Sequence, residues 1–133
     1  MQGPEILKIH HVAILTSNEL YEKSKNFYTE VLGFKIIRET FRESRNSYKL
    51  DLAIQDLYQI ELFSFPDFRE RGSYPECKGL RHLSFLVKDL EQSVRALNEK
   101  GVITEPIRTD ELTQKRFTFF EDPNHQPLEI YEL

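Results

Sequence analysis

Residues 8–33, KIHHVAILTSNELYEKSKNFYTEVLG, have a counterpart in residues 81–101, RHLSFLVKDLEQSVRALNEKG. Each copy begins with a short apolar run that carries a histidine, continues through a polar turn into a helical pattern, and ends at a glycine. The copies lie about 70 residues apart, and a repeated pattern at a fixed period is typical of a duplicated structural unit. The sequence therefore predicts two related halves.

The first half predicts the order β-α-β-β-β. Residues 7–15 alternate in a way that favours a strand, and because both faces are mostly apolar we expect it to be internal. Ser17 or Asn18 is the expected N-cap of the next helix, and Gly33 is its expected left-handed end. Three extended runs complete the half, at residues 34–41, 48–54 and 58–65.

The second half repeats this order. Residues 80–87 predict a strand, Asp89 with Gln92 three positions on predicts a capped helix, and Gly101 ends it. The remaining strands are expected at residues 102–108, 115–120 and 128–131, with the turn sequence Asp122-Pro123-Asn124 between the last two.

A single βαβββ unit cannot close a hydrophobic core, so the two halves are expected to pair. The prediction is an α+β fold in which two βαβββ modules form a curved mixed sheet around a metal-binding cleft. We expect one domain over residues 1–133, with module one at about 7–65, a polar linker at about 66–79, and module two at about 80–133.

The composition of the chain disfavours several classes of function. The net charge of −4 comes without any block of like charges, which disfavours nucleic acid or an anionic membrane as a partner. The chain has no run of about 20 apolar residues, and its first residues, MQGPEILK, do not resemble a signal peptide, so we expect a cytoplasmic protein. The single cysteine, Cys77, is interpreted as an ordinary thiol of the linker.

Each half carries one histidine on its first predicted strand and one glutamate on its last. These residues are His11 and Glu61 in the first half and His82 and Glu129 in the second. A carboxylate within a buried run is costly unless it is paired or bound to a metal. Singly, the four residues are compatible with core histidines and edge glutamates. Their recurrence at the repeat period instead favours a site of two nitrogen and two oxygen donors for Zn, Ni, Co, Mn or Fe.

The motifs HHVAI, FYTEVLGF, LRHLSFLV and FTFFEDPNHQPLEI resemble the vicinal-oxygen-chelate superfamily over nearly the whole chain, and within it the glyoxalase I branch. By position, the resemblance implies that His11, Glu61, His82 and Glu129 bind one divalent metal ion. Related epimerases have glutamine where Glu61 stands, and fosfomycin-modifying relatives and extradiol dioxygenases use two histidines and one glutamate. The ligand set is therefore similar to that of glyoxalase I.

The resemblance implies a lyase or isomerase of the lactoylglutathione lyase type, acting through a metal-bound enediolate on a small hemithioacetal-like substrate. Glu129 is the first candidate for the catalytic base and Glu61 the second. Lys115 matches a basic residue near the C-terminal turn, so Lys115 and its neighbour Arg116 are candidate substrate-binding residues. The resemblance further implies a homodimer, in which the metal site lies within one chain or is shared between two.

Two positions depart from the glyoxalase I pattern. Leu15 and Phe65 stand where that family has an arginine and an asparagine that contact glutathione. The sequence pattern therefore does not assign glutathione as the thiol carried by the substrate. The alternatives are a ligand-sequestering protein of the bleomycin-resistance kind and an iron dioxygenase. His10, expected opposite His11, is interpreted as a packed or hydrogen-bonded histidine, and His125 as an exposed one.

Overall fold

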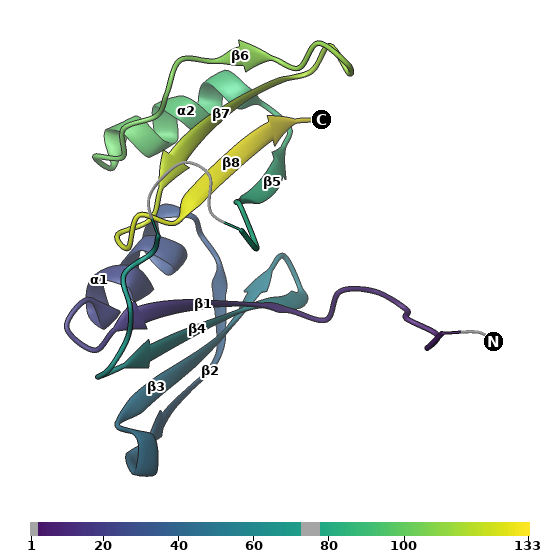
Figure 1. The fold of residues 1–133 in the computed structure, drawn as a ribbon. Helices are drawn as coiled ribbons and strands as arrows, with labels where there is room; N and C mark the ends of the chain where they lie inside the picture. The colour runs from purple at the N-terminus through teal and green to yellow at the C-terminus, as the bar shows by residue number, and fades with distance from the viewer. Residues whose placement is uncertain (1–2, 73–77) are drawn as a thin grey trace. The chain divides into compact units, whose positions relative to one another are not determined.

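The computed structural model describes residues 3–72 and 78–133, and Cys77 lies outside this range (Figure 1). The chain divides into two compact units, Met1–Phe68 and Arg69–Leu133. Each unit contains one four-stranded mixed sheet with helical segments, which confirms the predicted α+β class and its two modules. None of the helices in the described ranges is long and apolar enough to cross a bilayer.

Unit 1 follows the predicted order, with short helical turns added. Its elements are β1 Val12–Ser17, α1 Tyr21–Asn26, a π-helical turn Phe27–Val31, β2 Lys35–Arg42, a 3-10 turn Glu43–Arg45, β3 Ser47–Ile54 and β4 Leu57–Phe65. The strands are arranged β1-β4-β3-β2. The pair β1 and β4 is parallel, and the other two pairs are antiparallel.

The first strand differs from the prediction in its start and its position. It begins at Val12 rather than at Leu7, and within unit 1 it pairs only with β4, at the edge of the sheet rather than inside it. Residues 3–11 are exposed and lie outside any strand. Alternation indicates which side chains share a face, but it contains no information on whether a neighbouring strand is present to pair.

The two faces of the unit 1 sheet have different roles. One face carries the buried core residues of β3 and β4, among them Leu50, Leu52 and Leu62, and α1 covers it through the contact of Ser24 with Thr16. The opposite face carries the alternate residues of β4. Because side chains alternate along a strand, Glu61 lies there with Phe63 and Phe65.

The helix boundaries in unit 1 follow local hydrogen bonding. The Ser17 hydroxyl accepts a hydrogen bond from the backbone N–H of Leu20 at 3.0 Å, so Ser17 supports the turn that leads into α1. Leu20 itself occupies the N-cap position and has no side-chain cap. After the π-helical turn, Gly33 has φ +78°, as predicted for a residue that reverses the chain at a helix end.

Unit 2 has the same strand arrangement, β5-β8-β7-β6. Its elements are β5 Leu83–Val87, α2 Leu90–Glu99, β6 Arg108–Thr109, β7 Arg116–Glu121 and β8 Pro127–Glu132. The Asp89 carboxylate accepts a hydrogen bond from the Gln92 backbone N–H at 3.0 Å, which confirms the predicted cap of α2. Gly101 has φ +83°. The predicted turn between β7 and β8 is also present, held by the Asp122 side chain.

The strand predicted at residues 102–108 is mostly absent. Only Arg108 and Thr109 pair with β7. Upstream, the Glu105 backbone N–H donates one hydrogen bond to the Phe119 carbonyl at 2.9 Å, but the next residue is Pro106, which has no N–H to donate. The apolar character of the segment predicts a strand, but the N–H donor missing at Pro106 prevents a continuous ladder.

Candidate metal centre

His11 and Glu61 form a close pair in unit 1. His11 directly precedes β1, and the parallel register places Ala13 beside Glu61 on β4. His11 Nε2 lies 3.4 Å from Glu61 Oε2, and Glu61 is only 7% exposed. This separation is longer than an ordinary hydrogen bond. It fits the roughly 3.0–3.5 Å expected between two donor atoms that each lie about 2.1 Å from one metal ion.

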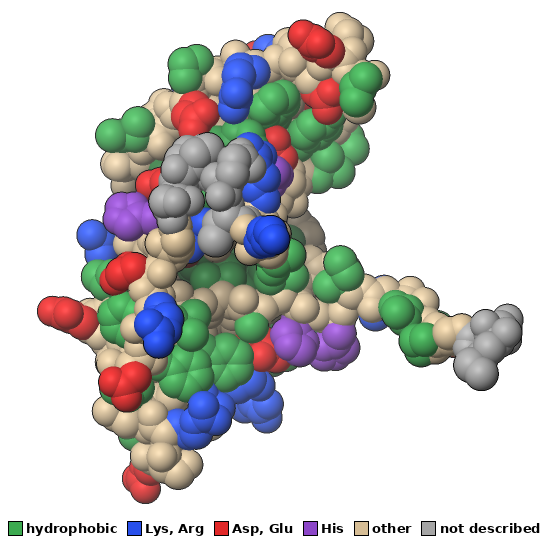
Figure 2. Space-filling model, in the orientation of Figure 1, with side chains coloured by type: hydrophobic (Ala, Val, Ile, Leu, Met, Phe, Trp, Pro, Cys, Tyr) green, Lys and Arg blue, Asp and Glu red, His purple; other side chains and the backbone are tan. Residues whose placement is uncertain are grey.

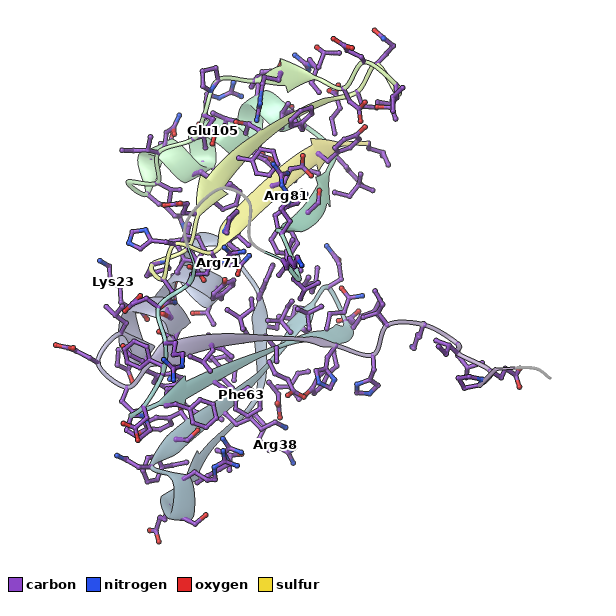
Figure 3. The ribbon with its side chains drawn as sticks, viewed as in Figure 1. Lys23, Arg38, Phe63, Arg71, Arg81 and Glu105 are labelled. Atoms are coloured by element: carbon purple, nitrogen blue, oxygen red, sulfur yellow. The ribbon has the colours of Figure 1, made fainter. Side chains whose placement is uncertain are left out.

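The Glu61 carboxylate also has polar neighbours. The Tyr58 hydroxyl donates a hydrogen bond to Glu61 Oε2 and lies 2.9 Å from Asp51 Oδ1. The Lys49 ammonium lies 3.7 Å from Glu61 Oε2 and 3.2 Å from Asp51 Oδ1. Figure 3 labels Arg38, whose guanidinium pairs with Asp51 at 3.3 Å. These contacts restrain Glu61 in one position.

Tyr58 and Asp51 titrate far from neutral pH. Burial, and then hydrogen bonding to Glu61 and Asp51, raises the pKa of Tyr58 well above its ordinary value, because an ionised hydroxyl would face two carboxylates. Burial alone would raise the pKa of Asp51. The hydrogen bond from Tyr58 and the charges of Lys49 and Arg38 outweigh it and hold that pKa below its usual range. At neutral pH Tyr58 is therefore a donor and Asp51 an anion.

His10 contacts the other side of the His11 ring. Nδ1 of His10 lies 2.8 Å from Nδ1 of His11, which confirms His10 as a hydrogen-bonded histidine. The expectation that the two rings lie on opposite faces is wrong, because they precede β1 and strand alternation does not apply to them. Because Nδ1 of His11 contacts His10, the nitrogen of His11 that faces Glu61 is Nε2. Metal-binding histidines commonly have their second nitrogen hydrogen-bonded in this way.

Unit 2 contains a second pair, His82 and Glu129. His82 directly precedes β5, and the register places Ser84 beside Glu129 on β8. His82 Nε2 lies 3.6 Å from Glu129 Oε1, and Glu129 is 8% exposed. The His82 ring also meets the Phe119 ring edge-on, with centroids 5.0 Å apart.

The two pairs occupy equivalent positions but differ in their surroundings. In each module the histidine directly precedes the first strand, and the glutamate lies on the last strand, which pairs with it in parallel. Glu61 has His11, Tyr58 and Lys49 as polar partners. Among the described residues of its own unit, Glu129 has His82 as its one ion-pair partner. The Glu129 carboxylate is therefore the less restrained of the two.

The donor types in the two pairs fit a divalent ion. Imidazole nitrogen and carboxylate oxygen together suit borderline ions such as zinc, nickel, cobalt, manganese and iron. Over residues 3–72 and 78–133, no group of three or more histidine, cysteine, aspartate or glutamate side chains is close enough to hold a metal. Taken separately, each unit thus offers one histidine and one glutamate.

The two candidate substrate-binding residues have different partners. The Arg116 guanidinium pairs with the carboxylates of Glu132, at 3.0 Å, and Glu91. These hydrogen bonds hold the pKa of Glu132 below its usual range. The Lys115 ammonium instead donates to the Leu133 carbonyl at 3.0 Å. Lys115 is exposed and forms no side-chain ion pair among the described residues, whereas the charge of Arg116 is balanced by two carboxylates.

His125 is exposed, as predicted, and lies in the turn after β7. Its Nδ1 is 3.2 Å from the Glu121 carboxylate, and its side chain is 78% exposed. It therefore offers a histidine beside an exposed glutamate for comparison with the two pairs whose glutamate is buried.

Two βαβββ modules, each with a histidine beside a buried glutamate at the same place, define the class of proteins built by duplication of this module. The chain belongs to the Glyoxalase/Bleomycin resistance protein/Dioxygenase superfamily, whose family model matches residues 8–130. It is 61% identical over 124 residues to the uncharacterized protein YwkD of Bacillus subtilis, covering 93% of this chain and 95% of YwkD.

Solved structures agree with this assignment. A glyoxalase family protein from Enterococcus faecalis is 49% identical, with a TM-score of 0.84, and the match covers 94% of this chain and 97% of that one. The fold alone is shared with two more distant proteins. These are TnmS3, an antibiotic binding protein from Streptomyces, at 19% identity and a TM-score of 0.73, and the fosfomycin resistance protein FosX from Listeria monocytogenes, at 16% and 0.70. The matches cover 98% of this chain and of TnmS3, and 96% of this chain and 94% of FosX.

Proposed function

We propose that this protein is a metal-dependent lyase or isomerase of the glyoxalase I type, acting on a small hemithioacetal-like substrate. The metal ligands are His11, Glu61, His82 and Glu129. The observation that supports this most strongly is the repetition of a histidine beside a buried glutamate at equivalent places in the two modules, with donor atoms 3.4 and 3.6 Å apart. Unrelated core histidines and edge glutamates would not be expected to repeat in this way.

A divalent ion held by these residues supplies positive charge that stabilises negative charge developing on a substrate oxygen. The chain's own groups then have separate tasks. Glu61, restrained by Tyr58 and Lys49, holds its position. Glu129, with His82 as its one ion-pair partner among the described residues of unit 2, is free to take a proton from a carbon next to a carbonyl and return it to the adjacent carbon.

Lys115 is the proposed contact for a negatively charged group of the substrate. Its ammonium is exposed and donates to the main-chain oxygen of Leu133, whereas Arg116 is paired with two side-chain carboxylates. An arriving anion has therefore to compete with two side-chain ion pairs at Arg116 but with none at Lys115 among the described residues. Arg116 has the supporting role of holding the start of β7 against Glu132.

The proposed functional form is a cytoplasmic homodimer. One ion requires one His-Glu pair from each kind of module, and the two modules are supplied by one chain or by two copies of it. The donor types suit several divalent ions, and Leu15 and Phe65 stand at the positions of the family's usual glutathione contacts.

Metal analysis tests the ligand set. The protein is stripped with a chelator, reloaded with one divalent ion at a time, and its metal content is measured per chain. We expect one ion per pair of modules, and a large loss of affinity in His11→Ala and in His82→Ala. His125→Ala removes an exposed histidine that also faces a glutamate, and it is the matched control. If the His82 variant keeps the affinity of the control, the four-ligand site is wrong.

Activity measurements test the reaction. Hemithioacetals formed from methylglyoxal and several thiols are supplied to the stripped and the reloaded protein, and conversion to the hydroxy thioester is followed. We expect turnover that depends on the restored metal and on one class of thiol. Tight binding of these compounds without any turnover would favour the ligand-sequestering alternative, and metal-dependent oxygen uptake would favour the dioxygenase.

A further inference from the structure

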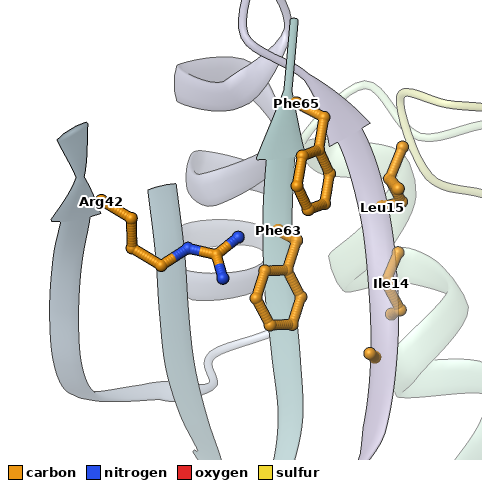
Figure 4. Close-up of a pocket in the computed structure, with 6 residues that line it drawn as sticks. Ile14, Leu15, Arg42, Phe63 and Phe65 are labelled. Atoms are coloured by element: carbon orange, nitrogen blue, oxygen red, sulfur yellow. The ribbon is translucent and has the colours of Figure 1, made fainter. Parts of the chain in front are cut away.

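Beyond the two pairs, unit 1 contains an open groove on the same sheet face as Glu61. Its volume is about 420 Å³, and Figure 4 shows its main lining residues. It is lined by Ala13, Ile14, Leu15, Arg42, Phe63 and Phe65. Its walls are therefore apolar except for one guanidinium.

Arg42 reaches this groove from a distant strand. It ends β2, two strands away from β4, and its guanidinium lies 4.9 Å from the ring centre of Phe63 and 5.5 Å from that of Phe65. A second arginine, Arg45, lies 5.3 Å from the centre of the Phe65 ring. The two aromatic rings orient a planar cation at the edge of the apolar groove.

The hydrogen-bonding capacity of Arg42 is largely unused. Nη2 donates to the Ser47 hydroxyl at 2.7 Å, whereas Nε is buried and has no hydrogen-bond partner among the described residues. Within that same range, no carboxylate forms an ion pair with Arg42, in contrast to Arg116 with its two. Buried donors without a partner are rare in folded proteins, and a ligand that binds there would satisfy one.

The groove lies along β4 next to the His11–Glu61 pair of unit 1. Glu61, Phe63 and Phe65 are alternate residues of β4, so their side chains follow one another on one face, with about 7 Å between successive members. Figure 2 shows hydrophobic side chains gathered on this part of unit 1, with Lys and Arg side chains at their border. A molecule that extends from Glu61 along this face of β4 would pass Phe63 and Phe65, over which the Arg42 guanidinium lies.

We propose that this groove is a binding subsite for the body of the substrate and that Arg42 recognises a carboxylate on it. The ligand class is an oxygenated small molecule with an apolar or aromatic portion and a carboxylate. This inference rests on the proposed function for its link to Glu61, but the binding of an apolar carboxylate by the groove does not require a metal.

The test uses metal-free protein with phenylacetate, its neutral analogue phenylacetamide, and acetate as probes, followed by NMR. We expect phenylacetate to shift the amide signals of Leu15, Phe63 and Phe65 and to bind about tenfold more weakly to Arg42→Gln. Phenylacetamide should bind the wild type and this variant equally, and acetate should bind more weakly than phenylacetate.

Lys35→Gln is the control, since it removes one positive charge from the same strand at an exposed position. It should leave phenylacetate binding unchanged. Equal affinity of wild type and Arg42→Gln for phenylacetate, or shifts confined to residues around Lys115, would overturn the proposal. The amide shifts that phenylacetate causes in the wild type show whether it binds in the groove, without the use of a variant. The binding experiment contains no metal. A failure of phenylacetate to bind would therefore contradict the groove proposal without contradicting the proposed metal site.

Discussion

The Tyr58 hydroxyl donates a hydrogen bond to the Glu61 carboxylate, although both residues lie on β4 only three positions apart. In a regular strand, residues three apart point to opposite faces. The register between β3 and β4 shifts at this point, with Leu52 opposite Ile60 but Ala53 opposite Tyr58. The extra residue, Gln59, turns Tyr58 to the same face as Glu61.

Tyr58→Phe should therefore weaken metal binding about 10- to 100-fold, because the hydrogen bond that orients a ligand carboxylate is lost. The unfolding free energy should fall by about 1–2 kcal/mol, because buried acceptors lose their donor. Tyr21→Phe is the control, since Tyr21 donates to Glu39 away from the metal pair. The two variants are compared by metal titration and by urea unfolding. A similar fall in metal affinity in both would contradict a specific role for Tyr58.

Asp51 should contribute to the acid limit of stability. Its pKa is lower in the folded protein than in the unfolded chain, so its contribution is complete above the unfolded value and is lost as the pH falls through the folded one. We expect the wild type to lose stability below about pH 4 more steeply than Asp51→Asn. Urea unfolding midpoints measured from neutral to acid pH give the two slopes.

The control for this pH dependence is Asp56→Asn, at an exposed carboxylate. Its acid slope should equal that of the wild type. Other carboxylates with a lowered pKa, such as Glu39 and Glu132, remain in all three proteins and cancel in the difference. Parallel acid slopes in wild type and Asp51→Asn would show that the ion pairs of Asp51 do not stabilise the fold.

Glu129→Gln should separate metal binding from proton transfer. The amide keeps an oxygen donor and the shape of the side chain but cannot accept a proton, so kcat should fall by at least about 100-fold while the metal stays bound. Glu61→Gln should affect metal affinity more than kcat, because Glu61 is restrained by its neighbours. Glu121→Gln, on the surface, is the control. Full turnover in Glu129→Gln would remove the assignment of the base.

Lys115→Ala should weaken the binding of a substrate that carries a carboxylate or phosphate and leave a neutral analogue unaffected. The expected loss is about tenfold, the usual contribution of one charge-assisted hydrogen bond. Competition with a substrate analogue provides the measurement. Lys35→Ala removes another exposed positive charge as a control. An unchanged affinity after Lys115→Ala would leave Arg42 as the remaining candidate anion contact.

Asp89→Ala should lower the unfolding free energy by about 1 kcal/mol, because the N-terminal turn of α2 loses the acceptor of the Gln92 N–H. Asp89→Asn should retain most of the stability, since its side-chain oxygen can accept the same bond. Chemical unfolding of the two variants measures the difference, and metal affinity should be unchanged in both. An equal loss in both variants would show that the charge of Asp89, and not the cap, stabilises the helix.

Much of the architecture was predictable from local pattern. The repeat, the glycines after the two helical segments and the Asp89 cap depend on residues close together in the sequence, and their physical causes are local. The pairing of His11 with Glu61, and of His82 with Glu129, was expected from the repeat and is present in each unit. Strand ends were less predictable, since the start of β1 and the loss of pairing around Pro106 depend on a partner strand elsewhere.

The sequence by itself determined the duplicated βαβββ order and the four candidate ligand positions, because hydrophobic periodicity and turn chemistry act over a few residues. Only the tertiary structure decided which other side chains surround those ligands. Tyr58 reaches Glu61 through a bulge in β4, and Arg42 reaches Phe63 and Phe65 across β3. Both contacts depend on how strands far apart in the chain pair in register, and a one-residue shift of register reverses the face on which a side chain lies.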